Sequence, residues 1–218
     1  MDNTPPPLSL AAALVLPLPE GRRSAEIFVD GDLEIRLYAP KAHDPQTPHD
    51  RDELYIVAAG HGDFRVGDRV EPFVPGALLY VAANQPHRFE DFSDDFAAWV
   101  VFYGDVKTAG PSRRTGWQMS VAEARKLALP PDRASAEILV DGDIEVRFAA
   151  PATQGMQVPH DRDEFYVVAS GSGRYRIGDT ETAIGPGDLL FAAAHAEHGF
   201  IDRTNDFAEW IVFYGPVK

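Results

Sequence analysis

The sequence PHDRDE occupies residues 48–53 and is followed at once by the apolar run LYIVAA. The same six residues return at 159–164, where the apolar residues FYVV follow them. With this offset of 111, residues 8–107 align with residues 119–218 without a gap, and about half of the aligned positions are identical. A repeat of this length indicates that one structural unit is written twice along the chain.

The expected domain organisation follows from this repeat. We expect a disordered Pro-rich tail at 1–7, a first domain at 8–107, a linker at 108–118 and a second domain at 119–218. Each domain of about 100 residues is long enough to enclose a hydrophobic core of its own.

The composition limits the partners and the compartment of the protein. The 218 residues carry a net charge of −14. This charge repels phosphate backbones and anionic membrane surfaces, so we expect no nucleic-acid partner and no membrane partner. The chain has no cysteine, which excludes disulfides and thiolate sites and fits a cytoplasmic protein. No apolar run is long enough to span a bilayer.

Each repeat contains short alternating or apolar runs separated by turn signals. In the first repeat we expect a short helix near 9–15 and strands at 25–30, 33–39, 53–59, 64–66, 70–73, 78–81, 87–91 and 96–103. The second repeat follows the same order from Ala136 to Tyr214, after a helix near 119–127. Many short strands and little helix predict an all-β, antiparallel sandwich or barrel.

The strand that begins at Glu53 carries a candidate functional group. Alternation places Glu53, Tyr55 and Val57 on one face, and His87 begins another strand of the same core. A buried carboxylate and imidazole need polar partners, either each other in a metal-free network or a shared metal ion. Adding His49 gives two histidines and one carboxylate, which is the ligand set of a facial triad with open positions.

The second repeat carries the same set as His160, Glu164 and His198. We therefore predict up to two divalent transition metal ions per chain, with iron, manganese, nickel and zinc as the candidates.

These motifs resemble those of the cupin superfamily, and the two units together resemble a bicupin. The first cupin motif ends in His-x3-Glu-x6-Gly, which residues 49–60 and 160–171 match. The second motif is a Pro-Gly-Asp turn and a strand that lead to a histidine. Residues 186–198 match this motif, and residues 75–87 match it with Ala77 in place of the aspartate.

The resemblance implies two tandem jelly-roll barrels of the double-stranded β-helix type, each preceded by a short helix. The two barrels would form an intramolecular pseudo-dimer. The resemblance also allows a homodimer of two such chains. Cupin metal sites usually have three histidines and one glutamate, but Thr47 and Val158 replace the first histidine here. Two histidines and one glutamate are also found in the 3-hydroxyanthranilate dioxygenases, which space these ligands differently.

Three functions remain open from the resemblance. The first is a metal-dependent enzyme, an oxygenase acting on a small organic acid or aromatic molecule. The second is a metal-dependent isomerase or lyase acting on a sugar or keto acid. The third is a small-ligand-binding cupin without turnover. The two cavities are expected to differ, because Ala149 replaces Tyr38 in the second repeat.

Four further residues are candidates for contact with a substrate. Tyr55 and Tyr166 share the strand face of the two glutamates, with packing in the core as the alternative. Arg36 and Arg147 would bind a substrate carboxylate in a bidentate manner, with a solvent-facing Glu-Arg strand surface as the alternative.

Overall fold

The computed structural model describes residues 5–107, 115–130, 133–150 and 155–218. The first four residues of the expected tail and residues 108–114 of the expected linker lie outside this range. Of the expected linker, residues 117 and 118 belong to a strand. No helix in the described part of the chain is long and apolar enough to cross a membrane.

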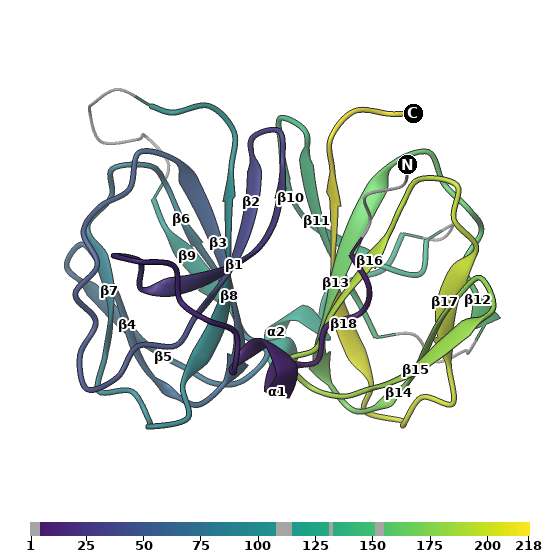
Figure 1. The fold of residues 1–218 in the computed structure, drawn as a ribbon, viewed down its shortest axis with the longest axis horizontal. Coiled ribbons are helices and arrows are strands. Elements are labelled where there is room, and N and C mark those ends of the chain that lie inside the picture. The colour runs from purple at the N-terminus through teal and green to yellow at the C-terminus, as the bar shows by residue number, and fades with distance from the viewer. Residues whose placement is uncertain (1–4, 108–114, 131–132, 151–154) are drawn as a thin grey trace. The chain divides into compact units, whose positions relative to one another are not determined.

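The strands of the first repeat form two antiparallel sheets (Figure 1). Their bounds are β1 (Ser24–Asp30), β2 (Leu33–Tyr38), β3 (Asp52–Ala59), β4 (Gly62–Val66), β5 (Arg69–Phe73), β6 (Leu78–Val81), β7 (His87–Glu90) and β8 (Ala97–Tyr103). With β9 (Trp117–Met119), the larger sheet has the order β1-β2-β8-β3-β6-β9, and the smaller sheet has the order β5-β4-β7. Each strand expected in this repeat is present, and the ends differ from the prediction by two residues at most.

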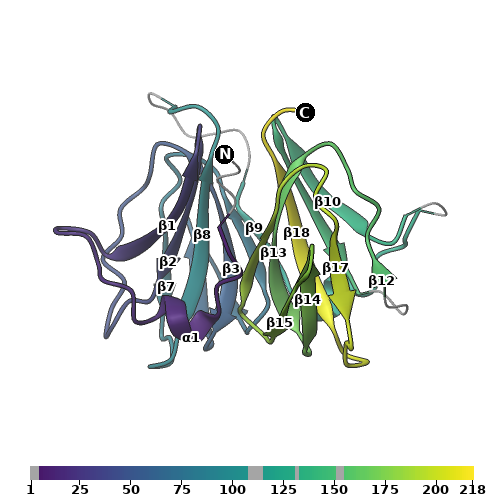
Figure 2. The ribbon, with the colours of Figure 1, turned by 45° about the vertical axis from the view of Figure 1, so that its right-hand side comes forward.

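The second repeat forms the equivalent pair of sheets, which Figure 2 shows from another direction. Its strands are β10 (Ala136–Asp141), β11 (Ile144–Ala149), β12 (Gly155–Met156), β13 (Asp163–Ser170), β14 (Gly173–Ile177), β15 (Thr180–Ile184), β16 (Leu189–Ala192), β17 (His198–Ile201) and β18 (Ala208–Tyr214). One sheet has the order β10-β11-β18-β13-β16 and the other β12-β17-β14-β15.

These paired sheets are the two tandem jelly-roll barrels that the sequence predicts. A short helix precedes each barrel, α1 (Leu10–Ala13) before the first and α2 (Val121–Ala124) before the second. The Ser9 hydroxyl caps α1 by accepting a hydrogen bond from the Ala12 amide at 3.2 Å. The all-β prediction is therefore confirmed, including the two helices.

The segments before the helices pair with the opposite repeat. Met119 of β9 pairs with Leu78 of the first barrel. In the same way Leu8 and Leu189 of the second barrel exchange backbone hydrogen bonds of 2.8 and 3.0 Å. The compact units are accordingly Ala13–Ser120 in one case and Met1–Ala12 with Val121–Lys218 in the other. The repeat limits at 8–107 and 119–218 stay a prediction about the sequence unit.

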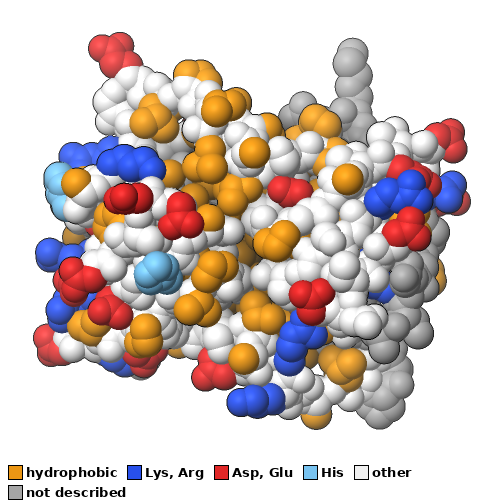
Figure 3. Space-filling model, turned by 90° about the horizontal axis from the view of Figure 1, so that it is seen from below, with side chains coloured by type: hydrophobic (Ala, Val, Ile, Leu, Met, Phe, Trp, Pro, Cys, Tyr) orange, Lys and Arg blue, Asp and Glu red, His pale blue; other side chains and the backbone are white. Residues whose placement is uncertain are grey.

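The residues that follow α1 are apolar and exposed. Leu14, Val15 and Leu18 are 48%, 81% and 58% exposed. Figure 3 shows that hydrophobic side chains reach the surface among charged ones on the face that it presents. The run LVLPL at 14–18 is thus a surface segment of the chain rather than a part of either core.

The two cores differ at one charged position. Glu209 on β18 is 2% exposed and lies opposite Ala149 and Val168 in the sheet, where the first barrel has Ala98. Its Oε2 atom has no hydrogen-bond partner among the described residues. Burial raises the pKa of Glu209 to about 8, with the charge of Arg203 opposing and that of Glu164 adding to the shift.

Leu8 tests the pairing of the N-terminal segment. Leu8→Pro removes the amide that donates to Leu189, so we expect a loss of about 1–3 kcal/mol in the unfolding free energy. Leu8→Ala keeps both backbone hydrogen bonds and should lose less. Denaturant unfolding and hydrogen exchange at the Leu189 amide measure the difference. Equal effects of the two variants would contradict the pairing.

Glu209 predicts a dependence of stability on pH. The folded protein holds this proton up to about pH 8, whereas the unfolded chain releases it near its ordinary pKa. The unfolding free energy should therefore fall between about pH 5 and about pH 8, by on the order of a few kcal/mol. Glu209→Gln should remove this fall, and the exposed Glu197→Gln should not. Parallel pH profiles for wild type and Glu209→Gln would show that the carboxyl is not proton-bound.

Candidate metal centres

Three side chains of the first unit converge from a loop and two strands. His49 lies in the loop before β3, Glu53 lies on β3, and His87 is the first residue of β7. One ligand atom of each lies within 4.8 Å of the other two. Since β3 and β7 belong to different sheets, the cluster forms where the two sheets of the barrel meet.

Hydrogen bonds fix the orientation of His87. Its Nδ1 atom lies 2.8 Å from the carbonyl oxygen of Gln85, which can only accept, so Nδ1 carries a hydrogen. In the neutral ring, Nε2 then presents its lone pair on the side of Glu53, whose Oε2 atom is 3.6 Å away. Metal-binding histidines usually donate their other N–H group to a carbonyl or carboxylate in this way.

Glu53 is buried but ionised. Burial would raise the pKa of Glu53, but hydrogen bonds and charge from His49 and His87 outweigh it and lower the pKa to about 2. His49 Nδ1 lies 2.5 Å from Glu53 Oε1. Burial would lower the pKa of His87, but the hydrogen bond and charge of Glu53 raise it. The carboxylate thus requires a positively charged partner. This partner is either a protonated histidine or a metal ion that replaces the histidine proton.

The second unit brings together His160, Glu164 and His198 within the same 4.8 Å. The Nε2 atoms of both histidines lie 2.6 Å from Glu164 Oε1. His198 Nδ1 donates to the carbonyl oxygen of Ala196 at 2.8 Å, as His87 does to its own loop. Burial opposes ionisation of Glu164, but hydrogen bonds from the two histidines lower its pKa.

Two atoms of the second cluster lack partners. Glu164 Oε2 and His160 Nδ1 are buried without a hydrogen bond in the part of the chain that the structure describes. A buried polar atom without a partner costs about 1–3 kcal/mol, and more when it is charged. A metal ion on the carboxylate would satisfy the oxygen, so this donor set suits a bound cation.

Tyr55 and Tyr166 are in contact with the clusters rather than only packed in the core. The Tyr55 hydroxyl donates to Glu53 Oε2 and lies 3.0 Å from His87 Nε2. Tyr166 has the same two contacts in its own cluster, at 2.9 Å from the histidine. Burial, followed by the glutamate charge, raises the pKa of both phenols well above the usual value, so each keeps its proton.

Arg36 lines the same cavity as His49, and Arg147 lies over the ring of Phe213, but the guanidinium groups of both arginines are already paired. Arg36 Nε donates to Glu34 Oε1 at 2.6 Å, and Arg147 Nε donates to Glu145 Oε1 at 2.6 Å. The solvent-facing alternative for this strand surface does not hold for Arg36, which is 6% exposed. Both faces of β2 are buried, because Leu33, Ile35 and Leu37 are buried on the other side.

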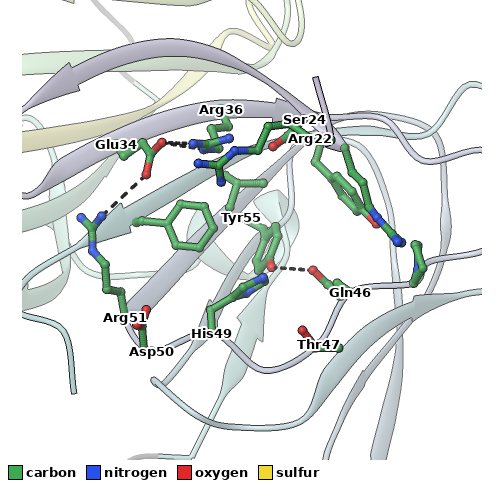
Figure 4. Close-up of a pocket in the computed structure, with 16 residues that line it drawn as sticks. Arg22, Ser24, Glu34, Arg36, Gln46, Thr47, His49, Asp50, Arg51 and Tyr55 are labelled. Carbon is green, nitrogen blue, oxygen red and sulfur yellow. Dashed lines mark hydrogen bonds and ion pairs between the residues drawn. The ribbon is translucent and has the colours of Figure 1, made fainter. Parts of the chain in front are cut away.

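A cavity of about 540 Å³ opens beside the first cluster. Figure 4 shows His49 and Tyr55 on its wall together with Arg22, Arg36 and Arg51. Its volume is in the range of small-molecule sites, which is about 300–1,000 Å³. The first cluster is therefore reached from a space that a small ligand can fill.

Sequence reasoning did not single out two residues of this wall. Arg51 lies within the repeated motif, between His49 and Glu53, and Gln46 precedes the motif by two positions. One feature of the sequence could have identified them, because both residues recur in the second repeat, as Arg162 and Gln157.

Comparisons with known proteins agree with the fold and the repeat. The family model described as cupin domain matches residues 35–103 and again residues 145–214. A protein of Streptomyces coelicolor described as uncharacterized protein SCO3923 is 36% identical over 73 residues, which cover 33% of this chain and 70% of that protein.

Two solved structures show how far the fold extends. A cupin 2 conserved barrel domain protein from Leptotrichia buccalis aligns with a TM-score of 0.70 and 14% identity, over 97% of both chains. A salicylate 1,2-dioxygenase variant from Pseudoaminobacter salicylatoxidans, in complex with gentisate, aligns with a TM-score of 0.67 and 12% identity. That alignment covers 98% of this chain and 84% of the dioxygenase. At such identities the likeness shows the fold alone.

Together, the two matched segments span more than half of the sequence, and each contains both histidines and the glutamate of one cluster. The chain therefore belongs to the cupin domain family, with one family domain in each repeat.

Proposed function

We propose that each cluster binds one divalent transition metal ion, up to two per chain, with iron, manganese, nickel or zinc as the candidates. We further propose that the first barrel is a metal-dependent enzyme of the oxygenase type, acting on a small organic acid or aromatic molecule. The observation that carries this proposal is the convergence of His49, Glu53 and His87 beside a cavity of about 540 Å³.

The donor set supports the metal part of this proposal. Two imidazole nitrogens and one carboxylate oxygen are ligands that all four metals accept, and three protein ligands leave other coordination positions open. The bound ion would supply Lewis acidity and, if it is iron or manganese, electron transfer. The carbonyl group of Gln85 keeps His87 in the ligating orientation.

The surrounding side chains would bind and orient the substrate. Tyr55 keeps its proton, which it donates to Glu53, and it lies on the cavity wall, so its hydroxyl oxygen is available to accept a hydrogen bond from a substrate. Arg36 would contribute positive charge to the same wall. In the second barrel, Tyr166 and Arg147 are the candidates for these two roles.

The alternatives rest on narrower observations. Salicylate 1,2-dioxygenase, which shares the fold, has been solved with the aromatic acid gentisate, and this favours an oxygenase. The hydrogen bond from Tyr55 to Glu53 places a proton donor beside a carboxylate, and this favours an isomerase or lyase. Dependence of turnover on oxygen separates the two.

Cytoplasmic location and a homodimer remain predictions.

Metal content is the first test. Protein purified without a metal-affinity column should hold about two equivalents of one transition metal by plasma mass spectrometry, or take them up on reconstitution. His87→Ala and His198→Ala should each remove about one equivalent, because each cluster then keeps only two ligands. His61→Ala, an exposed histidine outside both clusters, is the control. Full metal content in both cluster variants would contradict the proposed sites.

Oxygen uptake is the second test. Iron-reconstituted protein offered a panel of small aromatic acids should consume oxygen together with the acid, and zinc-reconstituted protein should not. Tyr55→Phe should slow uptake by about 10-fold to 100-fold while keeping its metal, because a positioned hydrogen bond to the substrate is lost. Tyr166→Phe makes the same change in the second barrel and shows whether that barrel contributes to the uptake. Turnover of a keto acid or sugar without oxygen would favour the isomerase or lyase instead.

A further inference from the structure

A short segment follows the last strand of the first barrel and contacts the loop that carries the first histidine of the cluster. We call this segment, residues 104–107, the strap. It begins at Gly104, whose φ of 70° is a backbone conformation that favours glycine. At its other end, the Lys107 amide donates to the carbonyl oxygen of Asp50 at 2.7 Å. The strap therefore holds the backbone directly after His49.

The carboxylate of Asp52 joins the strap to two other parts of the barrel. Asp52 directly precedes the ligand Glu53 and is 2% exposed. Its Oδ1 atom accepts from the Ala83 amide at 2.7 Å, and its Oδ2 atom accepts from the ammonium group of Lys107. A buried carboxylate needs such partners, and the half-exposed Lys107 side chain supplies the positive charge.

The turn between β6 and β7 completes the network. The Asn84 amide donates to the carbonyl oxygen of His49 at 2.6 Å, and Asn84 Nδ2 donates to the carbonyl oxygen of Lys107 at 3.0 Å. Asn84 has a φ of 64°, which asparagine adopts more readily than most residues. His87 follows this turn and donates to Gln85 in it, so one network contacts the segments that carry all three ligands.

The second barrel has the same network, with a strap at 215–218. The Lys218 amide donates to the carbonyl oxygen of Asp161 at 2.7 Å, and the Lys218 ammonium group donates to Asp163 Oδ2. Asp163 is 6% exposed, and its Oδ1 atom accepts from the Ala194 amide at 2.8 Å.

His195 takes the place of Asn84 in this second network. Its φ is 65°, and its amide donates to the carbonyl oxygen of His160 at 2.7 Å. Its Nε2 atom lies 3.3 Å from the backbone oxygen of Lys218. The network is therefore kept although the residue at the turn has changed.

We infer that Lys107 and Lys218 are positioning residues, each of which holds the first histidine and the glutamate of its cluster in place for metal binding. His49 depends on such support, because it lies in a loop and its side chain is 32% exposed. Groups that contact the ligands rather than the metal commonly set the ligand geometry. The inference rests on the proposed function for the metal, whereas the position of the loop can be measured without it.

The charge of Lys107 acts in the opposite direction. A positive charge near a cation site repels the cation, so a lysine that acted through its charge alone would weaken metal binding. Its removal would then strengthen metal binding. A lysine that holds the loop strengthens metal binding, and its removal weakens it. The sign of the effect therefore separates the two roles.

The experiment measures the zinc affinity of one cluster at a time, by competition with a chromophoric chelator. His198→Ala leaves the first cluster for study, and His87→Ala leaves the second. With the first cluster alone, Lys107→Met should weaken zinc binding by about 10-fold to 100-fold. Lys107→Arg, which can still donate to Asp52, should recover most of this loss.

Lys218→Met is the matched variant. It should weaken zinc binding by the same factor in the second cluster and leave the first cluster within about twofold. Lys126→Met, a change at an exposed lysine outside both networks, should leave both clusters within about twofold.

Hydrogen exchange in the metal-free protein gives an independent measurement. Lys107→Met should speed exchange at the Asn84 amide, which donates to His49, by about tenfold or more at a temperature where the barrel stays folded. The melting temperatures of all variants establish that temperature.

Several outcomes would overturn the inference. These are unchanged or stronger zinc binding in Lys107→Met, or an equal loss in the first cluster from Lys218→Met. A lower melting temperature with unchanged zinc affinity would show that the lysine only stabilises the fold. If neither cluster binds zinc with its lysine intact, the proposed function fails, and exchange at the Asn84 amide then decides whether the strap holds the loop.

Discussion

The buried carboxylate of Glu53 is the constraint on which the first site depends. At 1% exposure it stays ionised only because hydrogen-bond donors surround it, and these come from separate parts of the chain. His49 precedes β3, Tyr55 lies on β3, and His87 begins β7 in the other sheet. The two sheets must therefore close on each other before the carboxylate is stabilised, so formation of the barrel and formation of the site are one event.

The repeat shows which parts of the barrel this constraint fixes. The glutamate, both histidines and the tyrosine are identical in the two repeats, and in each barrel the tyrosine hydroxyl contacts both the glutamate and one histidine. The interior beyond them has changed. The facing pair Tyr38 and Ala98 in the first barrel becomes Ala149 and Glu209 in the second, at matching positions of β2 with β8 and of β11 with β18. A bulky phenol on one strand is thus exchanged for a carboxyl group on its neighbour.

The sequence predicts the strands and the ligand clusters well because both follow from local patterns. Alternation identifies the face that Glu53 shares with Tyr55, and the gapless repeat shows that each prediction holds twice. The pairing of Leu8 with Leu189 could not be predicted, since it joins the first repeat to the barrel of the second. The burial of Arg36 could not be predicted either, because an alternation of Glu and Arg gives the same sequence pattern whether it faces solvent or a cavity.

The contrast between Arg36 and Arg51 shows why residue type alone does not assign a role. Arg36 lies deep in the wall, but Glu34 two residues earlier on the same strand already accepts from its guanidinium group. Arg51 lies in the loop before β3 and keeps two buried donors without acceptors. What a guanidinium group can bind depends on which of its N–H groups the fold has already paired with acceptors. By the same reasoning, the buried carboxylate of Glu164, which stays ionised and whose Oε2 atom has no hydrogen-bond partner among the described residues, is matched by a cation rather than by a further acceptor.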